Sequence, residues 1–362
     1  MVTRRRFLQS GLVVGVGGAF FGNQLLAQSK DESQYISRFS KRLKPLGRIL
    51  ELENSYVWGC SAIVDEEGLL HLFFSRWNSK RGMGGWINSS EIAHAVADSA
   101  TGTFRNIETI LSPWGRDFFD ATTCHNPHIQ KVDDRYCLFY IGNSNGKTNT
   151  KRIALATSDS LYGPWERPNK PLLEVGLHNE WDNHCTSNPS FLKHPNGQYW
   201  LYYKSWNSSD YEQSDHPTIR GNRKYGLAIA DSLEGPYLKY KDNPIVDYSA
   251  LGENRQLEDA YVFIENGRFY MIARDMGRFD HEVGIVLESD DGIHWSDPEI
   301  AYFGTSKYFS QSVAPAHLKK YGRFERPQIL MQEGHPTHLF VTTQGGKYNT
   351  SSPFVFEIEK LK

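Results

Sequence analysis

The sequence predicts an all-β protein, a single five-bladed β-propeller, and three observations support this fold. A loop rich in polar groups runs into a short apolar strand at residues 120–129, and the same design returns at residues 182–191. A unit of three strands built on such a start can be traced five times. The anchor residues of the five copies, 62 to 71 positions apart, are Cys60, Asn126, Asn188, Asp259 and Arg326. No amphipathic helix of about 10–15 residues separates the strands, which argues against a doubly wound α/β fold.

The composition fits this fold and limits the partners. The 362 residues are 39% hydrophobic and 13% aromatic, which is ample for a sizeable core. A formal net charge of −2 gives no electrostatic reason to expect binding to nucleic acid or to an anionic membrane surface. The nine tryptophans suit carbohydrate binding, because sugar C–H faces stack on indole rings. The sequence gives no indication of the oligomeric state.

The chain begins with an expected export signal, residues 1–28. The twin arginines Arg4 and Arg5 precede Phe7, Leu8 and a Gly-rich apolar run at residues 11–21, a pattern similar to twin-arginine signals. The run is too short to span a hydrocarbon core of about 30 Å comfortably, and an uncleaved membrane anchor is the alternative. Cleavage after Ala27 would give a periplasmic or secreted protein without membrane contact.

Residues 29–45 are expected to form an N-terminal arm, and residues 46–362 the propeller. The inner and second strands of the five copies are expected within residues 60–77, 126–143, 188–206, 259–275 and 326–346. The third strands are expected within residues 91–104, 152–165, 225–237, 283–295 and 354–359. A strand from the arm could complete the fifth blade and close the ring.

The four cysteines predict no zinc site, because they form no C-x-x-C pair. We expect no metal and no other cofactor. Cys137 lies in an apolar strand and is expected in the core. Cys124 and Cys185 occupy similar positions in the two polar loops, and an exported protein could join them by a disulfide. The spacing leaves this open.

A propeller brings the starts of its inner strands, and the loops between second and third strands, to one mouth, where we place the candidate site. The strand starts contribute Asp120, His125, Asn126, Asp182, His184, Asn188, Glu258, Asp259, Glu325 and Arg326. The loops contribute Trp77, Trp86, Glu91, Lys204, Trp206, Arg274, Asp275 and His281. Polar groups beside aromatic rings predict a sugar pocket. Structural roles are the alternative: Asp120 and Asp182 could cap their loops, His125 could occupy the central channel, and Asp259 could pair with Arg274 or Arg326.

From Trp58 to its end, the chain resembles the five-bladed glycoside hydrolases of families 43, 62, 32 and 68, and the related family 117. The motifs that carry the resemblance are Asn126-Pro127-His128-Ile129, Ser187-Asn188-Pro189-Ser190-Phe191, Leu257-Glu258-Asp259-Ala260-Tyr261-Val262, the turns 163–165 and 235–237, and the segment 289–295. Family 43 uses a base Asp opening blade one, a pKa-tuning Asp opening blade three and an acid Glu opening blade four. Glu258 matches the acid by position, but Cys60 and Asn188 hold the other two positions, so that mechanism does not carry over.

The resemblance implies an exported glycosidase that cleaves O-glycosidic bonds of plant or algal oligo- or polysaccharides from a chain end. Such cleavage needs one group that protonates the leaving oxygen and another that activates water or attacks. We predict Glu258 or His281 as the acid and Asp120 or Asp182 as the base; a His acid in family 117-like enzymes favours His281. A non-hydrolytic carbohydrate-binding propeller is the main alternative. A fructosyl-transferring enzyme is a weaker one, because its blade-one Asn-Asp-Pro and blade-three Arg-Asp-Pro signatures are absent.

Replacing both Arg4 and Arg5 with Lys is expected to block processing near Ala27 and to leave the precursor in the cytoplasm, because this route reads the arginine pair. Cell fractionation followed by immunoblotting measures the outcome. Unchanged export of the doubly substituted protein would contradict the twin-arginine assignment.

Overall fold

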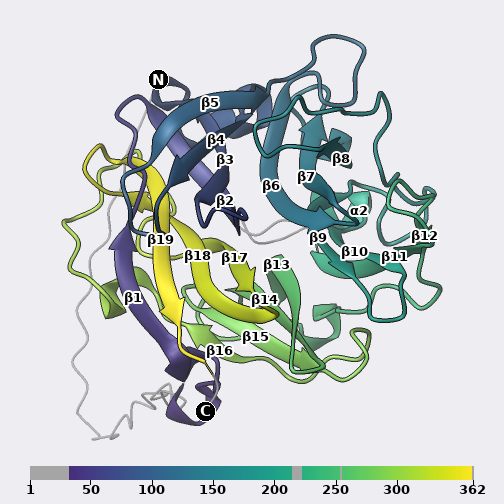
Figure 1. Cartoon of the computed structure of the whole chain (residues 1–362). Helices are drawn as coiled ribbons and strands as arrows, with labels where there is room; N and C mark the ends of the chain where they lie inside the picture. Colours follow the sequence, from purple (N-terminus) through teal and green to yellow (C-terminus); the bar gives the residue numbers. More distant parts are fainter. Residues whose placement is uncertain (1–31, 214–221, 253–254, 361–362) are drawn as a thin grey trace, which may run out of the picture. The chain divides into compact units, whose positions relative to one another are not determined.

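Five antiparallel β-sheets surround one axis in the unit Tyr35–Lys362 of the computed structural model, which describes residues 32–213, 222–252 and 255–360 (Figure 1). The five-bladed propeller predicted from the sequence is confirmed. The expected export signal lies outside the described residues. In the described part of the chain, no helix is long and apolar enough to cross a membrane.

Each blade is built from strands that follow one another in the chain. Blade one contains β2 (Ser55–Val64), β3 (Leu70–Asn78), β4 (Glu91–Ala97) and β5 (Arg105–Leu111). Blade two contains β6 (Thr123–Val132), β7 (Arg135–Asn143) and β8 (Arg152–Ser158). Blade three contains β9 (Ser187–Lys193), β10 (Tyr199–Ser205), β11 (Lys224–Ala230) and β12 (Leu238–Lys239). Blade four contains β13 (Gln256–Glu265), β14 (Arg268–Met276), β15 (Gly284–Ser289) and β16 (Glu299–Tyr302).

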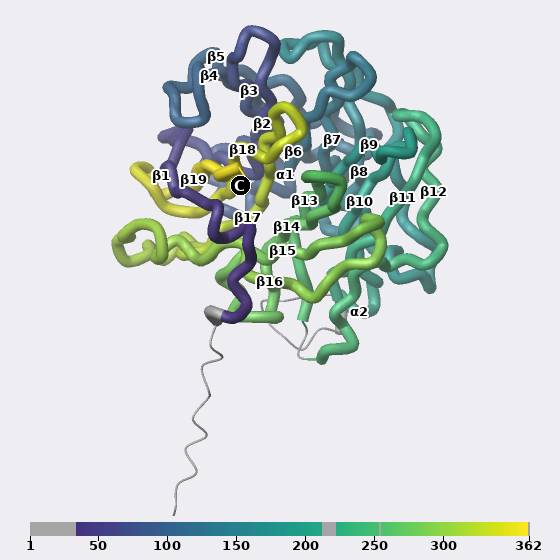
Figure 2. The backbone as a smooth tube through the Cα atoms, turned by 60° about the horizontal axis from the view of Figure 1, so that its bottom comes forward, coloured from purple at the N-terminus to yellow at the C-terminus, as the bar shows by residue number. Residues whose placement is uncertain are grey.

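Blade five joins the two ends of the propeller. It contains β17 (Glu325–Gln332), β18 (His335–Gly345) and β19 (Thr350–Ile358), and its outer strand is β1 (Leu43–Arg48). Strand β1 lies beside β19 (Figure 2) and runs antiparallel to it, with Leu43 opposite Ile358 and Arg48 opposite Phe354. The expectation that a strand near the N-terminus closes the ring is therefore confirmed, and this strand begins at Leu43.

Helical structure is short and lies before the first strand or between strands. Within the described residues, the α-helices are α1 (Trp86–Ser89) and α2 (Ser208–Gln213). The 3₁₀ segments are Glu32–Tyr35, Ser40–Arg42, Ser79–Arg81, Met83–Gly85, Thr148–Thr150, Ser249–Leu251 and Thr305–Lys307.

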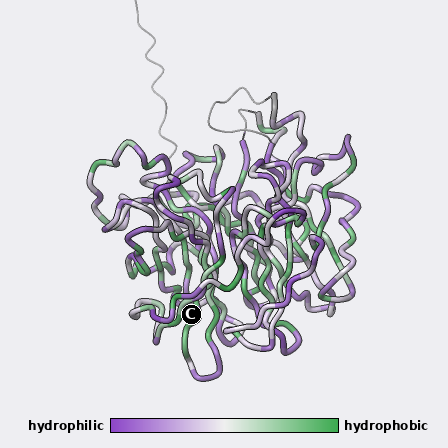
Figure 3. The backbone as a smooth tube through the Cα atoms, turned by 90° about the horizontal axis from the view of Figure 1, so that it is seen from above, coloured by the Kyte–Doolittle hydropathy of each residue, from purple (hydrophilic) through white to green (hydrophobic). Residues whose placement is uncertain are grey.

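The core is divided among the blade interfaces. Each pair of adjacent blades encloses one apolar cluster, for example Phe139 of β7 stacked on Phe191 of β9 with ring centroids 4.5 Å apart. Figure 3 shows hydrophobic stretches mainly in the interior and hydrophilic ones mainly toward the periphery. Burying each such aromatic side chain contributes roughly 1.5–3 kcal/mol. The blades are thus held as a ring by their flat faces, and the strand ends near the axis are left for polar groups.

Every inner strand carries the same irregularity near its start. The backbone turns left-handed at Gly59, Asn126, Asn188, Asp259 and Arg326, with φ of +58°, +54°, +50°, +62° and +56°. A register shift accompanies each of these residues, so each inner strand contains a β-bulge. The blade-one equivalent is therefore Gly59 and not Cys60, the anchor predicted from the sequence. Cys60 packs in the apolar cluster between blades one and five, because the bulge displaces the register by one residue.

Gly59→Ala is expected to destabilise the protein more than Gly68→Ala. Both glycines have positive φ, so each alanine costs about 1–2 kcal/mol in backbone strain. A Cβ at Gly59 would lie 2.6 Å from Asn126 Oδ1, whereas a Cβ at Gly68 meets nothing within 4 Å. The extra crowding is expected to cost roughly 1–3 kcal/mol, measured by chemical denaturation. Equal losses for the two variants would contradict the close packing at the axis.

Candidate active site

A pocket of about 680 Å³ opens at the axis, where the starts of the inner strands converge. This volume lies within the roughly 300–1,000 Å³ of small-molecule sites. All five blades contribute to its lining, and the inner strands supply Trp58, His125, Asn126, Asn188, Glu258, Asp259, Glu325 and Arg326. The sequence-predicted residues Trp86, Trp206, Arg274 and His281 also line it.

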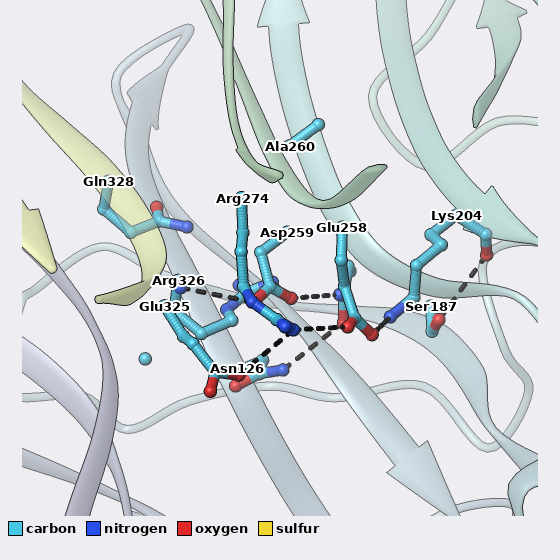
Figure 4. Close-up of polar contacts among 12 residues, drawn as sticks. Asn126, Ser187, Lys204, Glu258, Asp259, Ala260, Arg274, Glu325, Arg326 and Gln328 are labelled. Carbon is cyan, nitrogen blue, oxygen red and sulfur yellow. Dashed lines mark hydrogen bonds and ion pairs between the residues drawn. The ribbon is translucent and has the colours of Figure 1, made fainter. Parts of the chain in front are cut away.

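Four of the left-handed residues form one hydrogen-bonded series across the axis, which we call the axial chain: Asn126, Asn188, Asp259 and Arg326. The amide of Asn126 donates to Asn188 Oδ1 at 3.3 Å, and the amide of Asn188 donates to Asp259 Oδ1 at 2.6 Å. Arg326 donates to Asp259 from its backbone N–H at 3.2 Å and from Nη1 at 3.5 Å. Figure 4 shows Asn126, Asp259 and Arg326 converging. Asp259 therefore carries the structural pairing that the sequence left open for it.

The residue before each bulge is aimed at the pocket or close to it. Trp58, His125, Glu258 and Glu325 precede the left-handed residues of four blades and all line the pocket. The fifth equivalent, Ser187, is fully buried, and the pocket position is taken by Lys204, which lies opposite it on β10. This one backbone irregularity therefore positions the side chains that the inner strands contribute to the pocket.

Glu258 is surrounded by cations. Lys204 Nζ donates to its Oε1, Arg223 Nε lies 3.3 Å from Oε1, and Arg274 Nη1 donates to Oε2 at 3.2 Å (Figure 4). Burial opposes ionisation of this carboxyl, but the three charges outweigh burial and hold the pKa of Glu258 well below its ordinary value. A general acid at neutral pH needs the opposite shift. The predicted acid role of Glu258 is therefore not supported, and the group is an ionised carboxylate.

Glu325 is a second ionised carboxylate beside the first. Arg323 Nε lies 2.8 Å from its Oε1, Lys320 Nζ lies 3.2 Å from its Oε2, and Arg274 Nη1 lies 3.7 Å from the same oxygen. Burial raises the pKa, but the Lys320, Arg274 and Arg323 charges lower it to about 2. Arg274 thus bridges Glu258 and Glu325, which come from neighbouring blades.

His281 reaches the pocket from the loop after β14, and Asp275 organises that loop. The carboxylate of Asp275 accepts backbone N–H groups from Gly277, Arg278, Phe279 and His281 at 2.9–3.3 Å. Asp275 is fully buried and does not line the pocket, so its predicted contact with substrate is corrected to a role in loop structure. His281 itself has φ of +67°, a conformation that the four bonds to Asp275 help to hold.

Asp120 and Asp182, the predicted bases, are buried behind the pocket wall. Asp120 accepts from Tyr140 Oη at 3.0 Å and from Arg167 Nη1 at 3.2 Å. Asp182 accepts from Tyr203 Oη at 2.8 Å and pairs with Lys239 at 2.6 Å. Neither carboxylate lines the pocket, and the repeated Asp–Tyr–cation set ties each loop to its blade. The predicted role of these two carboxylates as bases is therefore not supported. A polar loop before a strand can anchor that strand as well as take part in catalysis, and the sequence does not distinguish the two.

Two of the three predicted tryptophans line the pocket, and the third lies outside its lining. Trp86 lines the pocket and stacks on His125 with centroids 4.6 Å apart. Trp206 lines it too, but only 2% of the residue is exposed, so the ring is no open stacking platform. Trp77 stacks on Tyr56 away from the pocket. These placements correct the expectation that all three tryptophans are open to sugar.

Two further predicted residues are held by neighbours. Glu91 pairs with Arg76 at 2.6 Å and does not line the pocket, so its predicted substrate contact is also corrected. His125 Nδ1 lies 2.9 Å from Ser90 Oγ. Burial, together with the Arg326, Lys320 and Lys151 charges, keeps the pKa of His125 well below its ordinary value, so the ring is neutral.

Several pocket residues are not among those predicted from the sequence. They are Trp58, Lys151, Arg223, Lys319, Lys320 and Arg323. Trp58 could have been found by aligning the residue before each bulge. The basic residues lie in segments outside the repeated strands, where the repeat carries no positional information.

Within the described residues, the cysteines form no disulfide and the acidic groups form no metal site. Cys124 and Cys185 are both buried and free, so the disulfide left open by the sequence does not form. Within the described ranges, no group of three or more His, Cys, Asp or Glu side chains could hold a metal ion.

Glu325→Gln is expected to lower stability at about pH 7 and to flatten its pH dependence. Because the folded pKa is depressed, Glu325 contributes stability above its unfolded pKa, and this is lost as pH falls from about 4.5 toward about 2. The contribution is on the order of 3 kcal/mol. Denaturation at about pH 7 and about pH 3 measures the difference. The control Glu66→Gln removes an exposed pair with Lys131 and should change little; parallel pH profiles for wild type and Glu325→Gln would contradict the assignment.

Comparison with known proteins identifies the fold. No family model and no curated protein matches the sequence. The structure is similar to a family 117 glycoside hydrolase of the marine bacterium Zobellia galactanivorans, with a TM-score of 0.62 and 18% identity over 87% of this chain and 89% of that one. It is also similar to a family 43 β-xylosidase/α-arabinofuranosidase from a compost microbial metagenome, solved with xylotriose, with a TM-score of 0.56 and 16% identity over 88% and 98% of the two chains. A Xanthomonas citri family 43 enzyme, also solved with xylotriose, gives a TM-score of 0.53 and 13% identity over 88% and 91%. The chain therefore has the five-bladed propeller fold found in glycoside hydrolases of families 117 and 43.

Proposed function

We propose that this protein is an exported glycoside hydrolase that cleaves an O-glycosidic bond at the end of a plant or algal oligo- or polysaccharide. The observation that carries the proposal is the axial pocket, in which the ionised carboxylate of Glu258 and the imidazole of His281 line the same cavity. A pocket confined to the propeller axis favours a chain end over the middle of a long polymer.

His281 and Glu258 have different roles in the proposed cleavage. His281 donates a proton to the leaving glycosidic oxygen while the bond between that oxygen and the anomeric carbon breaks. Imidazole suits this step because its ordinary pKa lies near neutral pH. Glu258, kept ionised by Lys204, Arg223 and Arg274, serves as the second group, which either removes a proton from the attacking water or attacks the anomeric carbon itself.

The comparisons support the substrate class at the level of carbohydrate. Two of the similar family 43 structures are complexes with xylotriose. In this chain, Trp86 lines the pocket and is only partly buried, so its ring would offer aromatic surface to a sugar.

A carbohydrate-binding protein without hydrolytic activity is the second candidate. The observation that favours it is the pairing of both carboxylates: each oxygen of Glu258 and of Glu325 has at least one cationic partner. Fully paired carboxylates bind and position, but they attack only when a partner moves away.

The proposal predicts different losses for His281→Asn and Glu258→Gln. The first should lower turnover of natural oligosaccharides by about 10²–10⁴-fold, the usual contribution of a general acid. It should spare 4-nitrophenyl glycosides, whose leaving group needs little protonation. The second should lower turnover of both kinds of substrate, because Glu258 acts on the attacking side. Steady-state kinetics on a panel of aryl glycosides and oligosaccharides measures both effects.

The matched control is His178→Asn, which alters an exposed histidine outside the pocket lining and should leave turnover unchanged. Thermal unfolding of each variant separates lost chemistry from lost folding. Equal losses of His281→Asn on activated and natural substrates would contradict its role as the acid. Binding of oligosaccharides by the wild type without any product would establish the non-hydrolytic candidate instead.

A further inference from the structure

The pocket is strongly basic although the whole chain is slightly acidic. Its lining contains three carboxylates: Glu258, Asp259 and Glu325. Its lining also contains eight basic side chains: Lys151, Lys204, Arg223, Arg274, Lys319, Lys320, Arg323 and Arg326. The formal net charge of the chain is −2, so the excess of positive charge is local to the pocket.

Lys151 is the most informative of these cations. Only 5% of the residue is exposed, yet its ammonium has no ion pair and no side-chain hydrogen bond within the described part of the chain. It lies 4.7 Å from the centroid of the Trp206 ring and lines the pocket. Its backbone is held on both sides: its N–H donates to Thr148 and its carbonyl accepts from the N–H of Thr186. The ammonium is therefore held in place at the pocket without an anionic partner from the described part of the chain.

The positive charge of Lys151 contributes to lowering the pKa of two neighbouring groups. Burial, followed by the Lys151 and Arg152 charges, lowers the pKa of His184 to about 4. Burial also lowers the pKa of Lys204 to about 8, with Glu258 opposing and Lys151 reinforcing the shift. The Lys151 charge therefore acts in the same direction as burial on both neighbouring groups.

Arg326 offers further unused donors. It is 2% exposed, and its Nη1 bonds Asp259, whereas its Nε and Nη2 have no hydrogen-bond partner in the structure as described. A pocket that combines an ammonium without an ion pair and guanidinium donors without a hydrogen-bond partner is suited to receive negative charge.

We propose that the substrate is an anionic glycan, whose carboxylate or sulfate group forms the ion pair that Lys151 lacks. The inference rests on the proposed glycosidase function and narrows its substrate class. A carboxylate would come from a uronic acid unit, and a sulfate from a sulfate ester on a neutral sugar. Both are planar or compact oxyanions that an ammonium and a guanidinium recognise.

The test compares two matched pairs of oligosaccharides on the full-length protein by isothermal titration calorimetry. One pair is a trigalacturonate and its methyl ester, and the other is a sulfated galacto-oligosaccharide and its desulfated counterpart. The acidic member of at least one pair should bind about tenfold or more tightly than its neutral partner, and the pair that responds identifies the anionic group. Binding should weaken in about 1 M NaCl, where the screening length falls to roughly 3 Å.

Variants at Lys151 test whether this residue causes the preference for acidic oligosaccharides. Lys151→Gln should weaken binding of the acidic member by about tenfold to hundredfold, the loss expected for one hydrogen bond to a charged group. Lys151→Arg should retain most of the affinity. Lys241→Gln, at a lysine whose side chain is 84% exposed outside the pocket, should bind like the wild type. The melting temperature of Lys151→Gln should not fall, because the substitution breaks no ion pair.

Several outcomes would overturn the proposal. These are equal binding of acidic and neutral members, no binding of either acidic member, and unchanged binding by Lys151→Gln. A lowered melting temperature of Lys151→Gln with unchanged discrimination would likewise assign Lys151 to structure. Product analysis keeps the two proposals apart: acidic glycans that bind without being cleaved contradict only the glycosidase function, and neutral glycans that are cleaved while acidic ones fail to bind contradict only the anionic substrate.

Discussion

The axial chain of hydrogen bonds is the constraint on which the rest of the structure depends. Asn126 donates to Asn188, Asn188 donates to Asp259, and Arg326 donates to Asp259 from the opposite side. Because Asp259 only accepts, the direction of each amide in the series is determined. The blade-one position is Gly59, where any side chain would collide with Asn126. Asn and Asp suit these positions because they tolerate a left-handed backbone better than most residues.

The same bulges that build the axial chain also aim the functional groups. A left-handed residue rotates the strand start, so the preceding side chain faces the pocket and not the blade interface. This places Glu258 and Glu325 on neighbouring blades within reach of one guanidinium, that of Arg274. Two ionised carboxylates so close together need cations around them, and those cations in turn prevent either carboxylate from holding a proton near neutral pH. In the glycosidic cleavage proposed above, the proton would then come from a different type of side chain.

The repeat in the sequence was sufficient to predict the fold and part of the pocket. Asn126, Asn188 and Asp259 could be placed at the axis because they recur at one position of a repeated strand. Asp120 and Asp182 recur as well, but repetition cannot distinguish an anchoring carboxylate from a catalytic one. The difference lies in tertiary partners, Tyr140 for the first of these residues, which no local pattern reveals. The blade-one anchor was predicted at Cys60, one residue after its true position at Gly59. The reason is similar, because a β-bulge is not visible in an alternating pattern of residues.

Five basic residues of the pocket could not be predicted from the sequence, because they lie outside the repeated strands and the net charge of the chain is an average over its whole surface: Lys151, Arg223, Lys319, Lys320 and Arg323. Their arrangement also links substrate binding to the charge state of the site. Lys151 helps to depress the pKa of Lys204 to about 8, and Lys204 contacts Glu258 directly. An anionic group bound beside Lys151 would offset its field and raise the pKa of Lys204. Lys204 would then stay charged over a wider pH range and keep Glu258 ionised, so an acidic substrate would itself complete the electrostatic environment in which it is cleaved.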